Sequence, residues 1–196
     1  MNNFTKKFIF VGLCALLLSS GMYGQRRFAV KTNIPYWATL SPNAGAEFLL
    51  SSNHNYTLEI SGGFNPFKIS NDKQWKHWVM WAEARYWVFE PFNAHFFGLH
   101  YVGGGYNAGG VKLPFNVFEE LRTQRADGNV NGVGLSYGYS WIIGNNLTLE
   151  ATLGAGYARF NYDTYALGEN GERKGTGHKD YFGLTKGAIS LVYVFK

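Results

Sequence analysis

The chain has 196 residues, of which 46% are hydrophobic, 18% aromatic and only 16% charged, with 25 glycines and a formal net charge of +5 at pH 7. This length suits one domain, the mean hydropathy of −0.18 excludes a helical membrane protein, and the small positive charge without a basic run argues against nucleic acid as a partner. Few charges combined with many aromatic residues and glycines favour a β-rich chain that meets an apolar environment.

Residues 1–24 have the pattern of a cleaved signal peptide. Two lysines precede an apolar run from Phe8 to Leu18, which is too short to cross a bilayer as a helix and is followed by small residues. We predict cleavage near Gly24, so that residues 25–196 form the mature domain. The single cysteine, Cys14, lies within the apolar run and does not follow a small residue, so the sequence predicts neither a lipid anchor nor a disulfide.

Period-two alternation of apolar with small or polar residues dominates the mature chain. Between residues 132 and 141, for example, every second position is Val, Leu, Tyr or Trp, and the intervening positions are Gly or Ser. Segments of about ten residues suit strands that cross a membrane at a tilt, whereas strands of soluble sandwiches usually have about five or six residues. We predict eight strands, at residues 28–38, 43–50, 56–64, 77–89, 94–108, 130–142, 147–161 and 182–195.

The connections between these strands alternate in length. Short connections at 51–55, 90–93 and 144–146 alternate with long ones at 65–76, 109–129 and 162–181, and only the connection at Ser41–Pro42 breaks the order. Such alternation is typical of outer-membrane barrels with short periplasmic turns and longer external loops. The predicted fold is therefore all-β, an eight-stranded antiparallel up-and-down transmembrane β-barrel.

One long connection has a pattern of its own. Residues 115–125 have helical character, with Val117, Phe118 and Leu121 on one side. This segment either lies at the membrane interface or over the mouth of the barrel, or belongs to an irregular loop.

The alternation also sorts the charged residues of the strands onto the inner face. Four acidic and three basic residues share that face, namely Lys31, Glu47, Glu59, Glu83, Arg85, Glu150 and Lys186. Side chains fill the lumen of an eight-stranded barrel, and buried charges must pair to offset their lost hydration. We predict a structural salt-bridge network and a plugged lumen. Carboxylates such as Glu59 and Glu83 could act as acid and base, but near-balance of charge favours the structural interpretation.

Aromatic residues recur near the ends of the predicted strands. Such residues form girdles at the two membrane–water interfaces of outer-membrane barrels. We predict interfacial positions for Trp37, Trp78, Trp87, Tyr139, Trp141, Tyr157, Tyr193 and Phe195. By analogy with bacterial outer-membrane proteins, the aromatic Phe195 near the C-terminus is also a signal for the outer-membrane assembly machinery.

The five histidines show no spacing typical of a metal site. Four of them fall in loops or at strand ends, and His100 is predicted to point into the lumen. The mature chain would contain no cysteine to act as a nucleophile or metal ligand. The sequence therefore predicts no catalytic residue, no cofactor and no metal.

Several segments together resemble a Bacteroidota family of outer-membrane barrels catalogued as a domain of unknown function, DUF3575. The resemblance rests on Lys31-Thr32-Asn33, residues 38–43 with Glu47, Asn65-Pro66-Phe67, residues 75–78, Glu83 with residues 85–87, and residues 96–100, 137–141 and 154–158. It covers essentially the whole mature chain and implies an outer-membrane barrel. Some members are encoded near fimbrial or surface-adhesin genes, and no catalytic residue can be carried over.

These patterns predict a small outer-membrane barrel with a structural or surface-interaction role. Its expected partners are outer-membrane lipids, the assembly machinery and a surface fimbrial or envelope protein. One alternative is an enzyme that modifies lipids of the outer leaflet, with His100 or His95 beside a carboxylate. Another is a soluble periplasmic lipocalin-like barrel, whose apolar faces would point inward around a ligand.

Overall fold

The alternating segments form strands that pair with their neighbours in the chain. The computed structural model describes residues 28–50, 55–70, 73–110, 119–167 and 171–195, and the statements below concern these residues; the predicted signal peptide lies outside them. The elements in order are β1 (Phe28–Asn33), α2 (Ile34–Ala38), β2 (Asn43–Leu49), β3 (Tyr56–Asn65), β4 (Lys68–Ser70), β5 (Lys73–Trp87), β6 (Ala94–Gly109), the 3-10 helix η2 (Glu119–Arg122), β7 (Gln124–Ile142), β8 (Leu147–Ala166) and β9 (Arg173–Phe195).

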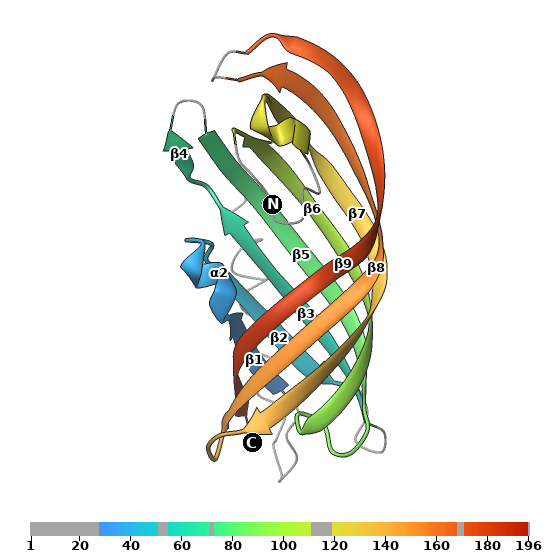
Figure 1. Ribbon diagram of the computed structural model, residues 1–196. Helices are drawn as coiled ribbons and strands as arrows, with labels where there is room; N and C mark the ends of the chain where they lie inside the picture. Colours follow the sequence, from blue (N-terminus) through green and yellow to red (C-terminus); the bar gives the residue numbers. More distant parts are fainter. Residues whose placement is uncertain (1–27, 51–54, 71–72, 111–118, 168–170, 196) are drawn as a thin grey trace, which may run out of the picture.

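Eight of these strands close into a ring (Figure 1). Each strand is antiparallel to its neighbours, β3 pairs with β5, and the ring closes where β1 pairs with β9 from Phe28–Phe195 to Asn33–Ser190. The short β4 pairs only with the start of β5. The prediction of an all-β fold with eight antiparallel strands is therefore confirmed.

The wall of the ring is much taller on one side than on the other. Strands β7, β8 and β9 have 19, 20 and 23 residues, whereas β1 and β2 have 6 and 7. Figure 1 shows the tall strands rising well above α2. The predicted loop at 162–181 is wrong, because β8 runs to Ala166 and β9 already begins at Arg173. The end of the predicted connection at 109–129 likewise belongs to β7, which begins at Gln124.

The predicted strand at 28–38 is also too long. Its second half is α2, a single helical turn that begins at Ile34 and carries Pro35 in its first positions. A proline lacks the N–H that a sheet ladder needs but fits the first turn of a helix. The predicted helical segment 115–125 is represented by η2 alone, with residues 115–118 outside the described chain and Gln124 already in β7.

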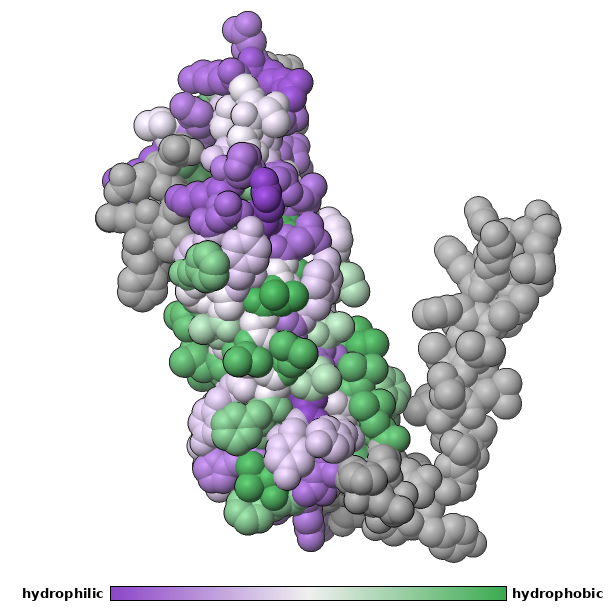
Figure 2. Space-filling view, turned by 90° about the vertical axis from the view of Figure 1, so that its right-hand side faces the viewer, coloured by the Kyte–Doolittle hydropathy of each residue, from purple (hydrophilic) through white to green (hydrophobic). Residues whose placement is uncertain are grey.

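The outer face changes abruptly from apolar to polar along the tall wall. The row Val133, Tyr157 and Phe182 runs across β7, β8 and β9, and Val133 and Phe182 are 54% and 79% exposed. The next outward row consists of Asn131, Arg159 and Asp180, all exposed, and the one above it of Asn129, Asn161 and His178. Figure 2 shows the apolar residues over the middle and lower part and hydrophilic residues at the upper end.

Below that boundary, large apolar side chains cover the outer face of every strand of the ring. Examples that are at least 44% exposed come from different strands, namely Ile60, Met80, Leu99, Leu135, Leu153 and Leu184. We call this zone the apolar band. No helix among the described residues is long and apolar enough to cross a membrane.

Candidate functional site

The predicted inner charges lie together in the lower half of the ring. Arg85 is their centre: its Nε is 2.6 Å from Glu83 Oε1, its Nη1 is 2.8 Å from Glu47 Oε2 and 3.0 Å from Glu150 Oε2, and its Nη2 contacts Glu59. One guanidinium thus touches all four glutamates, and its side chain is fully buried. We call these four glutamates with Lys31, Arg85 and Lys186 the charge network.

Two lysines complete the pairing. Lys31 Nζ lies 2.6 Å from Glu47, 3.1 Å from Glu59 and 3.1 Å from Glu150. Lys186 Nζ lies 3.0 Å from both Glu59 and Glu83. All seven residues are no more than 7% exposed, so each charge has exchanged its water for opposite charges and hydrogen bonds.

Hydroxyl groups satisfy the carboxylates further. Each glutamate accepts one hydrogen bond from a Ser or Thr on the inner face: Thr57 donates to Glu47 (2.6 Å), Ser61 to Glu59 (2.7 Å), Ser136 to Glu83 (3.0 Å) and Thr152 to Glu150 (3.3 Å). The sequence analysis gave these four hydroxyl groups no role in the network, although they have the same period-two parity that placed the glutamates inward.

Strand register explains why the network needs its cations. Glu47 lies directly opposite Glu59 across β2 and β3, and Glu59 lies opposite Glu83 across β3 and β5. Like charges in opposite positions destabilise a sheet, so the three carboxylates require Arg85 and both lysines between them. A chain with these glutamates and an apolar residue at position 85 would bury unpaired negative charge.

Below the network, apolar side chains close the lumen. Trp87, Phe92, Phe96, Ala29, Val192 and Val194 form one buried cluster, and the Arg85 guanidinium lies 4.2 Å from the centre of the Phe96 ring. The predicted interfacial position of Trp87 is therefore wrong. Its parity in β5 is that of Glu83 and Arg85, so its indole is fully buried and donates to Thr57 Oγ1 at 2.9 Å.

The other predicted interfacial aromatics lie on the outer side and are at least partly exposed. Trp78 and Trp37 are 55% and 52% exposed, while Trp141 and Tyr193 are 46% and 45% exposed. Tyr157 lies at the boundary between the apolar band and the polar rows, where its hydroxyl donates to Asp180 at 2.6 Å. Tyr139 packs against Trp141, and Phe195 against Tyr193.

Two histidines were candidates for catalysis. His100 points inward as predicted, with Nε2 2.9 Å from Thr185 Oγ1 and Nδ1 3.8 Å from Glu83 Oε2, but it is only 1% exposed. His95 lies elsewhere, with Nδ1 2.7 Å from the Tyr137 hydroxyl. The His–Glu–Thr arrangement around His100 is thus buried inside the ring. Among the described residues, no group of three His, Cys, Asp or Glu side chains could hold a metal ion.

A bulge in β9 explains how Thr185 joins Lys186 on the inner face. Lys186 pairs with Gly154 and Leu184 with Ala155, so one extra residue, Thr185, is inserted at this point. Its carbonyl accepts a hydrogen bond from Trp81 Nε1 at 3.2 Å, and Trp81 packs on Tyr36 with ring centres 6.1 Å apart. These side chains lie above the network, and the pocket between them and the two lysines measures about 30 Å³, about one water's share of liquid volume.

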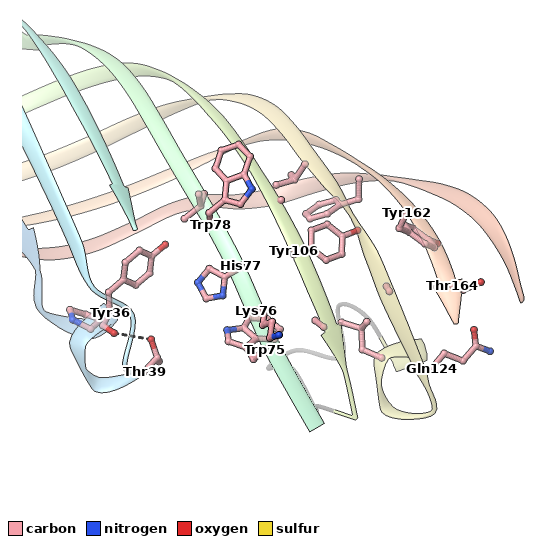
Figure 3. A pocket seen from close by; sticks show the side chains of 18 residues that line it. Tyr36, Thr39, Trp75, Lys76, His77, Trp78, Tyr106, Gln124, Tyr162 and Thr164 are labelled. Atoms are coloured by element: carbon pink, nitrogen blue, oxygen red, sulfur yellow. Dashed lines mark hydrogen bonds between the residues drawn. The ribbon is translucent and has the colours of Figure 1, made fainter. Parts of the chain in front are cut away.

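Above these side chains the lumen is different: it contains a cavity of about 460 Å³ with an apolar lining. Its wall includes Trp75, Tyr106, Leu121, Val130, Phe160 and Tyr162 from η2 and β5 to β8. Leu121 of η2 is buried against Ala108 and Ala126. Figure 3 shows Tyr36 on the opposite side, reaching toward the strands that carry His77 and Tyr106. The sequence analysis did not find this cavity.

The ring is incomplete beside this cavity. The β1 strand ends at Asn33, whose side chain adds two bonds to β9, donating to Gly187 O (3.3 Å) and accepting from Ile189 N (3.2 Å). From Gly187 up to Arg173, β9 pairs with β8 on one edge and with no described strand on the other. We call this interruption, between β9 and the top of β3 at Asn65, the lateral gap.

Comparisons with known proteins give one match. A family model described as "Protein of unknown function (DUF3575)" matches residues 9–195. No curated protein and no solved structure matches the chain.

Proposed function

The chain belongs to the DUF3575 family of proteins of unknown function, and from its geometry we propose that it is a transmembrane β-barrel of the outer membrane with a closed lumen. In this proposal its role is structural or in surface interactions, and it is neither a pore nor an enzyme. The observation that carries the proposal is the polarity of the ring, because charges are buried inside and an apolar band faces outward. Outer-membrane barrels have this inside-out arrangement.

The same polarity argues against the lipocalin-like alternative. A soluble barrel would expose its polar side chains and enclose its apolar ones. Here Leu99, Leu135 and Leu153 are 61%, 69% and 59% exposed, whereas Glu47 and Arg85 are at most 1% exposed. Water could not stabilise such a surface, but lipid chains would cover it.

Two features support a closed, non-catalytic barrel. The charge network and the cluster around Trp87 fill the lower lumen, which favours a plug over a conducting path. His100, the histidine beside Glu83, is only 1% exposed, which argues against contact with a substrate. We therefore assign the surface-interaction role to the upper end of the ring, where the β8–β9 hairpin carries polar rows beyond the apolar band. These rows suit contact with a surface fimbrial or envelope protein.

Envelope fractionation tests the location. Folded outer-membrane barrels resist detergent, so the unheated protein should migrate differently from the boiled protein on a denaturing gel and should sediment with the outer membrane. In planar bilayers, the purified protein should give no steady conductance. Recovery of soluble periplasmic protein without a heat-dependent shift would overturn the proposal.

Cysteine labelling tests the orientation. The predicted mature domain contains no native cysteine, since Cys14 lies in the signal segment. A membrane-impermeant maleimide added to intact cells should label Asn161→Cys in the β8–β9 hairpin and should not label Asn145→Cys in the β7–β8 turn. Both positions are exposed, and both should react after lysis. Labelling of Asn145→Cys alone in intact cells would reverse the orientation.

A further inference from the structure

The upper cavity has the size and lining of a ligand site. Small-molecule pockets usually measure about 300–1,000 Å³ and are mostly apolar with a few polar groups, and this one measures about 460 Å³. Its lining is dominated by aromatic and aliphatic side chains, among them Trp75, Tyr106 and Val130. One ring nitrogen, His77 Nδ1, is buried beside this space without a hydrogen-bond partner in the described chain.

The position of the cavity indicates where a ligand would come from. Phe160 and Tyr162 of its lining alternate along β8 with Arg159 and Asn161, which belong to the first two polar rows above the apolar band. The cavity floor, in contrast, lies at the level of the band. The cavity therefore straddles the boundary at which an outer-leaflet lipid places its headgroup and the start of its acyl chains.

The helix α2 joins the cavity to the outer surface. Pro35 and Tyr36 line the cavity, while Ile34 and Trp37 on the same helical turn are 47% and 52% exposed. Leu40, two residues after the end of α2, is 68% exposed. Because α2 lies beside the lateral gap, an apolar chain can move from the band into the cavity along apolar side chains, without crossing the polar rows of β7 to β9.

From these observations we propose that the upper cavity binds one aliphatic acyl chain, which enters through the lateral gap over α2, with an oxygen of its carboxyl or ester group at His77. A rigid, polar ligand would gain little from this lining, because it would leave its hydrogen-bonding groups unpaired. The chain can belong to a free fatty acid or to a membrane lipid. A membrane lipid as the source rests on the proposed function, whereas binding of the acyl chain in the cavity does not.

Native mass spectrometry of the full mature protein tests the inference. The protein is extracted in a bile-salt-type detergent, whose rigid body does not mimic an acyl chain, stripped of bound lipid, and mixed separately with hexadecanoic acid and with dipalmitoyl phosphatidylethanolamine. We expect one bound molecule per chain. Binding of the phospholipid, with or without binding of hexadecanoic acid, assigns a membrane-lipid chain as the ligand, and binding of hexadecanoic acid alone assigns a free fatty acid. Binding of neither overturns the proposal.

A pair of matched variants identifies the cavity as the place of binding. Val130→Trp fills the cavity from its wall, whereas Val133→Trp makes the same change on the outer face of the same strand, where Val133 is 54% exposed. Occupancy at equal ligand should fall at least tenfold in Val130→Trp and stay unchanged in Val133→Trp. Equal binding by all three proteins would place the ligand on the outer surface and overturn the proposal. Heat-dependent migration on a gel shows that each variant is folded.

His77→Phe examines the polar end of the ligand. Phenylalanine retains an aromatic ring at this position but has no ring nitrogen, so chain binding should persist while the preference for a carboxyl group weakens. We expect the ratio of affinities for hexadecanoic acid over hexadecane to fall in this variant. An unchanged ratio would remove His77 from the site and overturn that part of the proposal. The location of the protein in the envelope does not enter this measurement, so its failure is distinct from failure of the barrel proposal.

Discussion

The lower and upper halves of the lumen share strands of one ring but differ in how densely side chains fill them. In the lower half, seven charged side chains and an apolar cluster fill the lumen, the pocket beside Lys31 and Lys186 measures only about 30 Å³, and the ring is closed all round. In the upper half, apolar side chains line about 460 Å³ of open space and the ring lacks strands on one side. The lower half is therefore closed and densely packed, while the upper half leaves the space in which we propose that an acyl chain binds.

The largest difference should appear when an arginine is removed from each half. Arg85→Met leaves four buried glutamates with two lysines, and breaking a buried ionic network in this way costs about 3–5 kcal/mol. Arg159→Gln removes a side chain that is 49% exposed and lies 3.9 Å from Asp180, and exposed pairs contribute about 0–1 kcal/mol. Unfolding of both variants in lipid vesicles with guanidinium measures the two losses. Equal losses would contradict the division into two halves.

An arginine introduced on the outer face should destabilise the protein more in the apolar band than in the polar rows. Leu135 is 69% exposed within the band, and an arginine at the middle of a bilayer costs a barrel about 2–4 kcal/mol. Asn131 lies on the same strand, two outward-facing positions above Leu135. Asn131→Arg should reduce stability by only about 0–1 kcal/mol, because this position lies near the interface. The free energy of unfolding in vesicles distinguishes them. In a protein surrounded by water, Leu135→Arg would be harmless.

Alanine substitution of two glycines should show that side chains pack more tightly around the charge network than in the upper β8–β9 hairpin. A Cβ at Gly98 would lie 2.3 Å from Ser136 Oγ and 2.8 Å from the carboxyl carbon of Glu83, both in or beside the charge network. We expect Gly98→Ala to destabilise the protein by about 1–3 kcal/mol, as overpacking usually does. At Gly175 in the upper hairpin, the nearest atom would be Thr164 Oγ1 at 3.7 Å, so Gly175→Ala should be neutral in the same unfolding assay. A loss at Gly175 as large as at Gly98 would mean that the hairpin is packed as tightly as the lumen.

The smallest expected effect on stability concerns the exposed ion pair of Arg173 and Asp163, which lies above the apolar band. Arg173 donates to Asp163 at 2.8 Å and Thr176 donates at 2.7 Å, and these hydrogen bonds lower the pKa of the Asp163 carboxyl. The pair therefore stabilises the hairpin above the pKa that Asp163 has in the unfolded chain, and this contribution is lost as the pH falls through the lower, folded pKa.

Carboxyl NMR titration measures this shift. Arg173→Gln should raise the Asp163 pKa more than Thr176→Val does, because the arginine bond is the larger cause. Salt should weaken the arginine contribution, since both partners are exposed to water. An Asp163 pKa that does not move in Arg173→Gln would show that the pair is not formed in solution.

Parity accounts for most of what could be predicted about the lower site. Each charge of the network occupies the face opposite the apolar residues of its own strand, so local alternation was enough to name all seven. Trp87 was misplaced because its position at a strand end was given more weight than its parity with Arg85. Thr185 could not have been found in this way, since the β9 bulge that turns it inward is visible only in the pairing with β8.

The upper site could not be read from alternation at all. Trp75, Tyr106 and Tyr162 come from three strands, and Trp75 and Tyr162 stand in segments that the hydropathy pattern indicated to be loops. Hydropathy follows the environment of the outer face, which turns polar at the row of Asn131, Arg159 and Asp180. The strands nevertheless continue past that row, because backbone hydrogen bonds between β7, β8 and β9 form whatever the side chains are.

The sequence by itself determined the all-β class, the eight strands and the side of each strand that faces inward, because a period of two residues is a local property of the chain. Only the tertiary structure decided how tall each strand is, where the ring is interrupted and what space remains above the charge network. Those features depend on which distant segments pair and on how proline in α2 ends a short strand beside a long one. They therefore emerge only when the ring closes.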